Sequence, residues 1–451
     1  MFSFFYNTIF ILISGLSIAQ TTYFKSIAGG LNNQTSTFTV DSINNKLYVF
    51  GGFNKIINSN MSVKHAAIWD GVKWDSIRHI VGDSIDQITN INNVLYGVGF
   101  IITKLNSSTL HWDVIARPDR NGYFRRITKF NGDLIIFGSQ DSINGQKVSQ
   151  LVKYDGTNFT SIQGNLEIYS NVIMCEYNGE LYAGGSLYVQ GQGPCDLAKW
   201  NGTTWSIVPL TNTIPCSFCG LGTLIVYQNK LFIGGRFMQT SQSSLYTNLL
   251  SWDGTNIVDY GLLGTSVESA WDMCIYKNKL IITGFLNSPV PLSSQQFTGF
   301  LSYDGTDMCS YVPHYYNNQP YRLMAASVFQ DSLIFLSTRK MSPTDTVNYI
   351  CKFVGDINNP LYCVTGVGVK ENYMHNEAFK IYPNPTSNLL NISDENNAFQ
   401  NSTIEIKNYL GQVVFTTPFA SQINLQNLSA GMYFLTIQDK SSSKTVKFIK
   451  Q

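Results

Sequence analysis

A short motif that recurs seven times in residues 20–360 constrains the fold more than any other feature of the sequence. Most copies contain Leu, an aromatic residue or Ile, two apolar residues and then Gly or Gly-Gly, and they centre on Leu47, Leu95, Leu134, Leu181, Leu231, Leu280 and Leu333. Successive copies are 39 to 53 residues apart, a period typical of the blades of a β-propeller. We therefore expect a ring of similar β-sheets.

The residues around each motif predict four strands per repeat. The motif is a strand that ends in glycine, as in residues 45–52, and an apolar segment before it, such as residues 172–177, forms the preceding strand of a hairpin. A third strand ends at an aromatic-Asp-Gly or Trp-Asn-Gly turn, because Asp-Gly and Asn-Gly tolerate the positive φ of tight hairpins. These turns lie at residues 69–71, 154–156, 200–202, 252–254 and 303–305. A fourth strand follows, for example at residues 74–77, and four strands make one blade.

The first residues of the mature chain are expected to close the ring. The seventh repeat has a third strand at residues 349–355 but no convincing fourth strand, whereas Phe24-Lys-Ser-Ile27 has the missing pattern. Closure matters because an open ring exposes strand edges and loses the packing between its first and last blades. Only seventeen positions separate Leu95 from Trp112 in the second repeat, so a six-bladed ring is the alternative to seven blades.

Residues 1–19 are predicted to be a cleaved signal peptide. An apolar run from Ile9 to Leu16 precedes Ser17-Ile18-Ala19, which places small residues where a signal peptidase cleaves. A membrane anchor is the alternative, but the run is short for a span of ~20 residues, and no later segment is apolar enough to cross a bilayer. The mature chain is therefore expected to be exported, with no transmembrane span.

The composition changes after residue 360. A short polar stretch between Pro360 and Phe379, residues 366–378, has no hydrophobic period, which predicts a linker at residues 361–378. In residues 379–451, alternating apolar residues separated by Gly and Asn turns predict a small β-sandwich. Its landmarks are the opening Tyr382, Pro383, Asn384 and Pro385, an Asn-Tyr-Leu-Gly turn at Gly411, an Ala-Gly-Met-Tyr strand with Gly431 and Tyr433, and a basic KFIK end.

These four features resemble the C-terminal sorting domain of the type IX (Por) secretion system of Bacteroidota. The resemblance implies export to the periplasm, recognition of residues 379–451 by an outer-membrane translocon, and release or anchoring at the cell surface, usually with loss of the tail. An ordinary accessory sandwich is the alternative.

The repeats of the ring loosely resemble kelch repeats in their glycine pair, their aromatic-Asp-Gly turn and the Trp that follows it. The glycine pair is reduced to Gly99, Gly138 and Gly284 alone in three copies, and the copy at Leu333 has none. The resemblance implies the fold only. The expected fold is all-β: a seven-bladed, alternatively six-bladed, β-propeller followed by a small C-terminal β-sandwich.

The charge balance argues against a nucleic-acid grip or a polybasic membrane anchor. Lys and Arg number 30, Asp and Glu number 29, and 13% of the residues are charged, whereas both functions need clustered positive charge. Connections between second and third strands, and those between blades, should share one face, and loops on a rigid scaffold commonly bind ligands. Aromatic and basic residues there suit stacking on sugars or anchoring a protein, although each can instead cap the core. The predicted binding residues are Arg120, Tyr123, Tyr169, Trp271, His314, Tyr315, Tyr316 and Tyr321.

Eight cysteines in an exported chain permit disulfides. Cys195, Cys216 and Cys219 fall on the same loop face around one blade, which predicts a staple among them. A redox Cys-x-x-Cys is disfavoured, because Cys216 and Cys219 lie in a loop bounded by Pro and Gly with no helix behind it. Cys175 and Cys274 occupy the same position in their strands and are expected to be buried thiols.

Signals for catalysis are few. The chain has five His and contains neither an HExxH nor a Gly-x-Ser-x-Gly motif. Kelch-like propellers include copper oxidases with two His, two Tyr and one Cys, and His314 beside Tyr315 fits part of that set, but the pattern places no second His beside them. No cofactor and no metal site is predicted. We expect a secreted or surface-displayed protein that binds a glycan or a protein; the alternatives are a propeller enzyme acting on extracellular polysaccharide and a structural surface component.

Overall fold

The computed structural model divides into two compact units, Met1–Lys370 and Glu371–Gln451, so the boundary falls inside the predicted linker. It describes residues 23–59, 61–77, 85–106, 108–109, 111–120, 122–170, 172–210, 213–214, 220–239, 246–260, 269–287, 297–311, 323–337, 347–365, 380–393, 402–408, 412–438 and 443–451. The regular secondary structure of these residues is β-strand throughout. None of these described residues forms a helix that is long and apolar enough to span a membrane. The predicted signal peptide lies outside the described residues and stays a prediction.

The described part of the first unit contains seven sheets of four or five strands and one two-stranded hairpin. The first three sheets are β2 (Thr35–Asp41), β3 (Lys46–Gly51), β4 (Ala66–Trp69) and β5 (Trp74–Ser76); β6 (Ile85–Ile91), β7 (Val94–Gly99), β8 (Ile102–Asn106) and β9 (His111–Ala116); and β10 (Phe124–Phe130), β11 (Asp133–Gly138), β14 (Leu151–Tyr154) and β15 (Phe159–Ser161). The hairpin is β12 (Ser142–Ile143) with β13 (Gln146–Lys147).

The remaining four sheets complete the unit. The fourth is β17 (Ile173–Tyr177), β18 (Glu180–Val189), β19 (Gly193–Trp200) and β20 (Trp205–Ile207), with β16 (Leu166–Ile168) also paired to β18. The fifth is β22 (Gly220–Tyr227), β23 (Lys230–Gln239), β24 (Tyr246–Trp252) and β25 (Ile257–Asp259), with β21 (Thr213–Ile214) also paired to β23. The sixth is β26 (Ser269–Tyr276), β27 (Lys279–Asn287), β28 (Phe297–Tyr303), β29 (Asp307–Ser310) and β33 (Tyr362–Thr365), and the seventh is β30 (Leu323–Phe329), β31 (Ser332–Ser337), β32 (Ile350–Phe353) and β1 (Phe24–Ser26).

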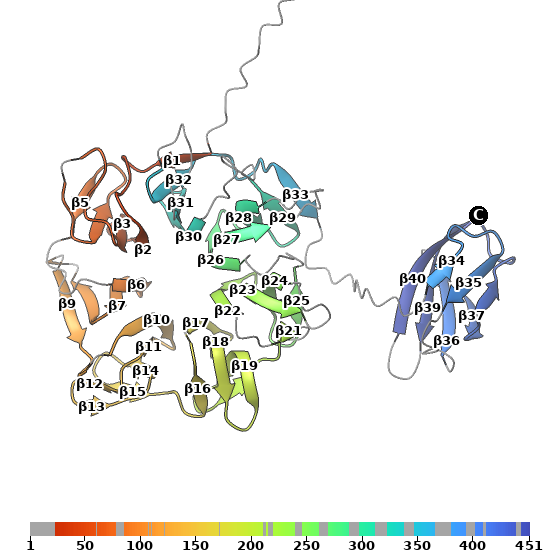
Figure 1. Cartoon of the computed structure of the whole chain (residues 1–451), viewed down its shortest axis with the longest axis horizontal. Helices are drawn as coiled ribbons and strands as arrows, with labels where there is room; N and C mark the ends of the chain where they lie inside the picture. Colours follow the sequence, from red (N-terminus) through yellow and green to blue (C-terminus); the bar gives the residue numbers. More distant parts are fainter. Residues whose placement is uncertain are drawn as a thin grey trace, which may run out of the picture. The chain divides into compact units, whose positions relative to one another are not determined.

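The sheets follow one another around a common centre, with the first strand of each repeat innermost (Figure 1). Each innermost strand contacts the innermost strand of the next sheet, in the order β2, β6, β10, β17, β22, β26 and β30, and β30 in turn contacts β2. The sheets therefore form a closed ring, as a β-propeller requires. The second repeat, whose short spacing suggested the six-bladed alternative, forms a complete four-stranded sheet from β6 to β9.

The repeated motif forms the second strand of each sheet, and the aromatic-Asp-Gly turn joins the third strand to the fourth, as predicted. The turn glycines have φ between 99° and 108°, a region that residues with a side chain rarely adopt. The side chain before the glycine secures the turn: Asp155 Oδ1 accepts hydrogen bonds from the N–H groups of Thr157 (2.8 Å) and Asn158 (2.7 Å). Asn201 Oδ1 accepts the equivalent bonds in the fourth sheet, so either Asp or Asn suffices.

A buried Trp at the start of a fourth strand links neighbouring sheets. Trp205 donates its Nε1–H to the carbonyl oxygen of Ile162 (3.0 Å), just beyond the third sheet. Trp74 donates in the same way to Ile27 (3.2 Å), just beyond β1 of the seventh sheet. These two indoles thus satisfy their polar groups while packing between sheets.

The predicted closure of the ring is confirmed. β1 pairs antiparallel with β32, and Phe24 lies opposite Phe353. The Phe24 side chain is only 3% exposed, and its ring centroid lies 5.8 Å from that of Phe335 and 6.5 Å from that of Phe300 in the sixth sheet. The N-terminal strand therefore completes the seventh sheet and packs against the sixth.

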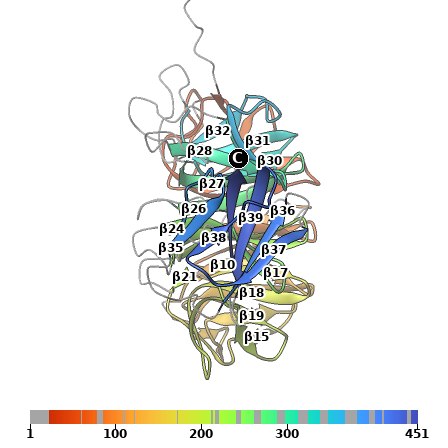
Figure 2. The ribbon, with the colours of Figure 1, turned by 90° about the vertical axis from the view of Figure 1, so that its right-hand side faces the viewer.

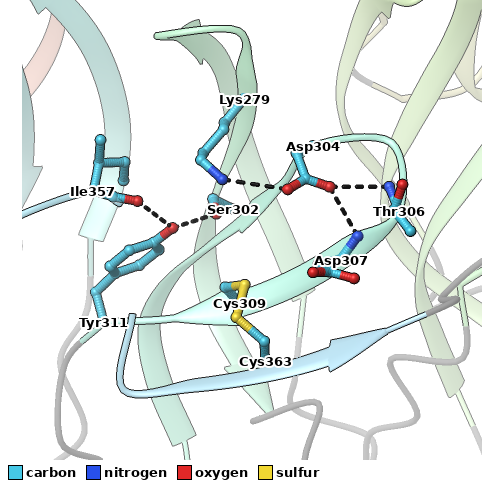
Figure 3. Close-up of a disulfide and its surroundings, with 9 residues drawn as sticks. All are labelled: Lys279, Ser302, Asp304, Thr306, Asp307, Cys309, Tyr311, Ile357 and Cys363. Atoms are coloured by element: carbon cyan, nitrogen blue, oxygen red, sulfur yellow. Dashed lines mark hydrogen bonds and ion pairs between the residues drawn. A yellow bond between two sulfur atoms is a disulfide. The ribbon is translucent and has the colours of Figure 1, made fainter. Parts of the chain in front are cut away.

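The sixth sheet contains a fifth strand that the sequence analysis missed. β33 lies in the segment predicted as a linker, and it pairs antiparallel with β29 (Figure 3). Cys309 and Cys363 are opposite each other in this pairing and form a disulfide. Nearby, the Tyr311 hydroxyl donates a hydrogen bond to the Ile357 carbonyl oxygen (3.0 Å). The prediction of a structureless linker from residue 361 is therefore wrong for its first residues.

The second unit is a β-sandwich, as predicted. One sheet has the order β34 (Lys380–Tyr382), β35 (Leu389–Ser393) and β38 (Gln422–Asn424), and the other has the order β37 (Val413–Pro418), β36 (Thr403–Asn408), β39 (Gly431–Gln438) and β40 (Ser443–Lys450). Buried aliphatic side chains of both sheets, including Leu390, Ile406 and Leu435, form one core with Phe448.

Several predicted sorting residues have structural partners in this sandwich. Asn384 Oδ1 accepts the N–H of Ile449 (3.0 Å), and its Nδ2 donates to the Lys447 carbonyl oxygen (3.2 Å). The Tyr-Pro-Asn-Pro opening, which contains two cis X-Pro bonds, is thereby tied to the basic end of the chain. Tyr433 stacks on Phe448 with a centroid distance of 5.7 Å. Gly411 lies outside the described residues.

Replacing Phe24 with alanine should destabilise the ring strongly. Phe→Ala substitutions in a core cost about 3–5 kcal/mol, and Phe24 fills a space between two sheets. Urea unfolding of the first unit should therefore shift to a lower midpoint. Lys25→Ala is the control, because that side chain is exposed on the same strand. Equal midpoints for both variants would contradict the closing role of β1.

Replacing Cys363 with serine should release β33 from β29. Loss of a native disulfide typically costs about 2–4 kcal/mol of unfolding free energy. We expect a lower unfolding midpoint without reductant, and we expect reductant to lower the wild-type midpoint while it changes that of the variant much less. Cys175→Ser, which removes a free thiol, is the control. A variant as stable as the wild type under oxidising conditions would argue against this disulfide.

Candidate functional site

The predicted binding residues that the structure describes do not form a single cluster. Arg120 lies between β9 and β10, Tyr123 directly precedes β10, and Tyr169 follows β16. Trp271, which was assigned to a loop, is instead part of the innermost strand β26. His314, Tyr315, Tyr316 and Tyr321 lie outside the described residues.

A β-bulge recurs near the start of the innermost strands, on the face that carries the connections between sheets. The register shifts by one residue in six of these strands. The extra residues are Ser36, Asp86, Arg125, Gly222, Trp271 and Met324. A bulge bends a strand and re-aims its side chains. The bulges therefore decide which side chains surround the centre of the ring on this face.

The glycines that end the repeated motif make room for these bulges. A Cβ atom on Gly138 would overlap the carbonyl oxygen of Tyr123. A Cβ atom on Gly284 would overlap the carbonyl oxygen of Ser269 in the same way. The glycine pattern is thus explained by the close approach of the innermost strand to the second strand, and it positions the side chains around Tyr123.

Phe100, Tyr123 and Arg125, here called the rim cluster, combine two aromatic rings with a cation. Phe100 lies between β7 and β8 and is 55% exposed. Its ring meets that of Tyr123 edge to face, with centroids 4.9 Å apart. The Arg125 guanidinium carbon lies 5.6 Å from the Tyr123 ring centroid, within the range of a cation–π contact. The cluster joins the second sheet to the third.

A second arginine, Arg126, contacts the backbone of the rim cluster. Arg126 is half-buried, and its Nη1 donates a hydrogen bond to the Arg125 carbonyl oxygen (2.9 Å). Burial lowers the pKa of Arg126, while the nearby Asp86 carboxylate opposes this shift. Because an arginine pKa stays far above neutral, the side chain remains charged. The site therefore holds a fixed positive charge beside the exposed Phe100 ring and the half-buried Tyr123 ring.

Arginine is concentrated around this cluster. Four of the eight arginines of the chain, Arg117, Arg120, Arg125 and Arg126, lie within ten residues. Among the residues that the structure describes, Arg117, Arg120 and Arg125 form no ion pair. Asp119 lies among them, but its Oδ2 accepts the N–H of Gly145 (2.7 Å). Of these arginines the predicted binding residues included Arg120, and a count along the chain would have revealed the density of the other three around it.

Tyr169 belongs to a different surface, on the connection between the third and fourth sheets. It is 66% exposed, and its hydroxyl donates to Glu167 Oε2 (2.8 Å). Gln190 Nε2 donates to the other oxygen of the same carboxylate (3.2 Å). β18 and β19 extend as a long hairpin beside this site (Figure 2).

Two polar side chains of the innermost strands have a structural role. Gln87 Oε1 accepts the N–H of Ile127 in the next innermost strand (2.8 Å). Asp272 Oδ2 accepts the N–H of Ala326 at the equivalent position of its neighbour (3.0 Å). An innermost strand has one edge without a partner strand, and its buried N–H groups require acceptors. These side chains therefore join adjacent sheets.

Other candidate sites are less developed. Within the described ranges, no group of three or more His, Cys, Asp and Glu side chains is placed to hold a metal ion. A hollow of about 330 Å³ lies between the first and second sheets, lined by residues that include Asp41, Asn93, Lys104 and Asp113. It involves the turns that join first to second and third to fourth strands, and so lies on the face opposite the rim cluster.

The predicted cysteine staple is wrong for Cys195. Its thiol is buried and free, because its strand position in β19 packs it among apolar side chains, and burial raises its pKa to about 12. Cys216 and Cys219 lie outside the described residues. Cys175 and Cys274 are free thiols, as expected, but they are only partly buried. Burial raises the pKa of Cys175 to about 11.

Comparison with known families identifies the C-terminal module. Residues 380–451 match the family described as "Secretion system C-terminal sorting domain". None of the curated proteins compared with the chain matches it. The module is therefore a sorting domain of the type IX secretion system, and it directs the protein to the cell surface or the extracellular space.

Solved structures similar to the chain include two extracellular β-rich proteins. One is PorZ, a surface component of the type IX secretion system of Porphyromonas gingivalis, with 13% identity, a TM-score of 0.40 and coverage of 94% of this chain and 60% of that chain. Another is the extracellular domain of the putative one component system BT4673 of B. thetaiotaomicron, with 12% identity, a TM-score of 0.45 and coverage of 96% and 58%. The chain thus spans about three fifths of the length of these proteins. The kelch resemblance is tested by none of these matches and stays a prediction.

Asp272→Asn should stabilise the protein at neutral pH. Burial raises the pKa of Asp272 to about 6, against opposing N–H bonds from Ala326 and Met273. Because the folded-state pKa of such a carboxyl lies above its unfolded-state pKa, its contribution to stability is fully present at pH values below the unfolded-state pKa. This contribution is lost as the pH rises through the folded-state pKa. The amide of Asn does not ionise and avoids this loss. We therefore expect the free energy of unfolding to rise by about 3 kcal/mol above pH 6 and to stay unchanged at pH 4.

Urea unfolding at both pH values measures this effect. Asp253→Asn is the matched control, because backbone N–H bonds from Asn256 and Thr255 lower the pKa of that carboxyl. The control should therefore show no gain at neutral pH. A gain for Asp272→Asn that is independent of pH would contradict the assignment.

Proposed function

We propose that this surface or secreted protein binds an extracellular ligand, a glycan or a protein, at the rim cluster, and that it acts without catalysis. The single observation that carries the proposal is the exposed Phe100 ring, held against Tyr123 and beside Arg125. Exposed aromatic side chains near cations are typical of the anchor residues of binding surfaces. The export of the chain supports a ligand outside the cell.

The rigidity of the surroundings supports the same proposal. Only Phe100 and Ile101 separate β7 from β8. Such a short connection restricts the backbone at Phe100 and therefore the position of its side chain. Tyr123 directly precedes the bulged strand β10, which Gly138 allows to approach closely. A surface that is ordered before the ligand arrives loses less conformational entropy on binding. Apolar contact area at this position can therefore contribute directly to affinity.

Removing residues 380–451 should stop delivery of the protein to the cell surface and the medium. The sorting module is a separate compact unit, so the ring should still fold and accumulate inside the cell. Cell fractionation and immunoblotting of full-length and truncated chains measure this. Fusion of residues 380–451 to an unrelated exported carrier is the control for sufficiency. Equal amounts of full-length and truncated chain in the medium would overturn the sorting role.

Replacing both Phe100 and Tyr123 with alanine should weaken ligand binding. Loss of aromatic anchors commonly costs about 1–3 kcal/mol of binding free energy, or roughly 5-fold to 150-fold in affinity. The purified mature chain is screened on a glycan array and against extracellular matrix proteins, and the affinity for each hit is then measured for the variants. Val72→Ala is the control, since Val72 is an 83% exposed apolar side chain in a third-to-fourth-strand turn. If the double variant binds every hit as the wild type does, the rim cluster is not the site.

A further inference from the structure

We propose that the rim cluster and the adjacent arginines bind an anionic glycan, a chain of sugar rings that carries carboxylate or sulfate groups. This inference rests on the proposed function and narrows its ligand class. Binding of such a ligand requires a local positive charge and a flat apolar surface. The surface must also favour sugar rings over an acidic peptide.

The positive charge is local, because residues 117–126 contain four Arg and one Asp. The whole chain carries a net charge of only +1, yet half of its arginines lie in residues 117–126. Arg117 and Arg120 are exposed on the connection into β10, and Arg125 is exposed at the bulge. Asp119 is engaged by the Gly145 N–H, and Asp86 lies near Arg126. Asp119 keeps its charge, but the arginines of this segment outnumber it, and the three exposed guanidinium groups can attract an anion from solution.

Arginine also sets the chemistry of the anion. Its planar guanidinium presents parallel N–H donors that match the two oxygens of a carboxylate or sulfate, whereas lysine acts as a point charge. Arg125 lies over the Tyr123 ring, so its orientation is restricted before the ligand arrives. Less side-chain entropy is then lost when an anionic group binds.

The aromatic rings favour a sugar over a peptide. Phe100 is exposed and sits in a connection of two residues between paired strands, so it presents a fixed apolar surface beside the cations. The C–H face of a pyranose ring is flat and apolar, while its carboxylate or sulfate projects from the ring edge. An acidic glycan therefore offers both contacts in every residue, whereas an acidic peptide offers the charge without the ring.

The test measures binding of the full mature chain to four polymers at low and high salt. The probes are polygalacturonate for carboxylate, chondroitin sulfate for sulfate with carboxylate, neutral dextran, and poly-glutamate for acidic peptide. We expect binding to at least one anionic glycan, weakening as salt is added because exposed charges are screened. We expect little binding to dextran and weaker binding to poly-glutamate than to the glycan.

Single substitutions separate specific recognition from general charge attraction. Arg125→Gln should weaken glycan binding by about 10-fold, and Arg125→Lys should recover only part of that loss because the paired donors are absent. Phe100→Ala should weaken binding to the glycan but not the residual binding to poly-glutamate. Lys352→Gln removes the same charge from an exposed position on β32 and should change nothing. Thermal unfolding midpoints verify that each variant is folded.

The possible binding results distinguish the anionic-glycan proposal from its alternatives. Equal losses for Arg125→Gln and Lys352→Gln would mean that only net charge matters, which overturns the site. Binding to dextran that ignores the arginine substitutions would overturn the anionic class while leaving glycan binding intact. Stronger binding to poly-glutamate than to any glycan would assign the rim to an acidic protein. Binding to none of the four polymers would overturn this inference, while a hit elsewhere on the array that Phe100 and Tyr123 control would preserve the proposed function.

Discussion

The hydrogen bonds between β1 and β32 are the constraint on which the first unit depends. They join residues separated by more than three hundred positions, and they place Phe24 between the sixth and seventh sheets. Without this pairing, β32 would keep an open edge, and the contact between β30 and β2 would be weakened. Closure therefore maintains the mutual positions of all the sheets, including the second and third, which together build the rim cluster.

The same ring geometry explains most polar groups near its centre. An innermost strand pairs on one side only, so its free N–H groups need other acceptors. Gln87 and Asp272 supply them from neighbouring strands, which assigns these residues to the architecture and not to chemistry on a ligand. The bulges, in contrast, expose side chains to a possible ligand, because they turn residues such as Arg125 away from the regular alternation of side chains along the strand. Glycines of the repeated motif, such as Gly138 and Gly284, leave room for the bulges.

The two units of the protein carry different features. The C-terminal sandwich carries the sorting signal, and the bonds of Asn384 to β40 tie its opening motif to its last strand. The ring carries the exposed aromatic and cationic surface. Export also agrees with the Cys309–Cys363 disulfide, since disulfides persist in oxidising compartments. Delivery and the proposed ligand recognition thus depend on separate modules, each with its own hydrophobic core.

The sequence by itself determined the features that depend on neighbouring residues. Strand order, the Asp-Gly turns and the sorting motifs are local patterns of polarity and φ, and even the closing strand at Phe24 was found because it repeats a local pattern. Only the tertiary structure decided which distant side chains meet: Phe100 with Tyr123, and Cys309 with Cys363 in a strand taken for a linker. The physical reason is that such contacts depend on bulges, strand pairing and sheet packing, which a one-dimensional periodicity does not encode.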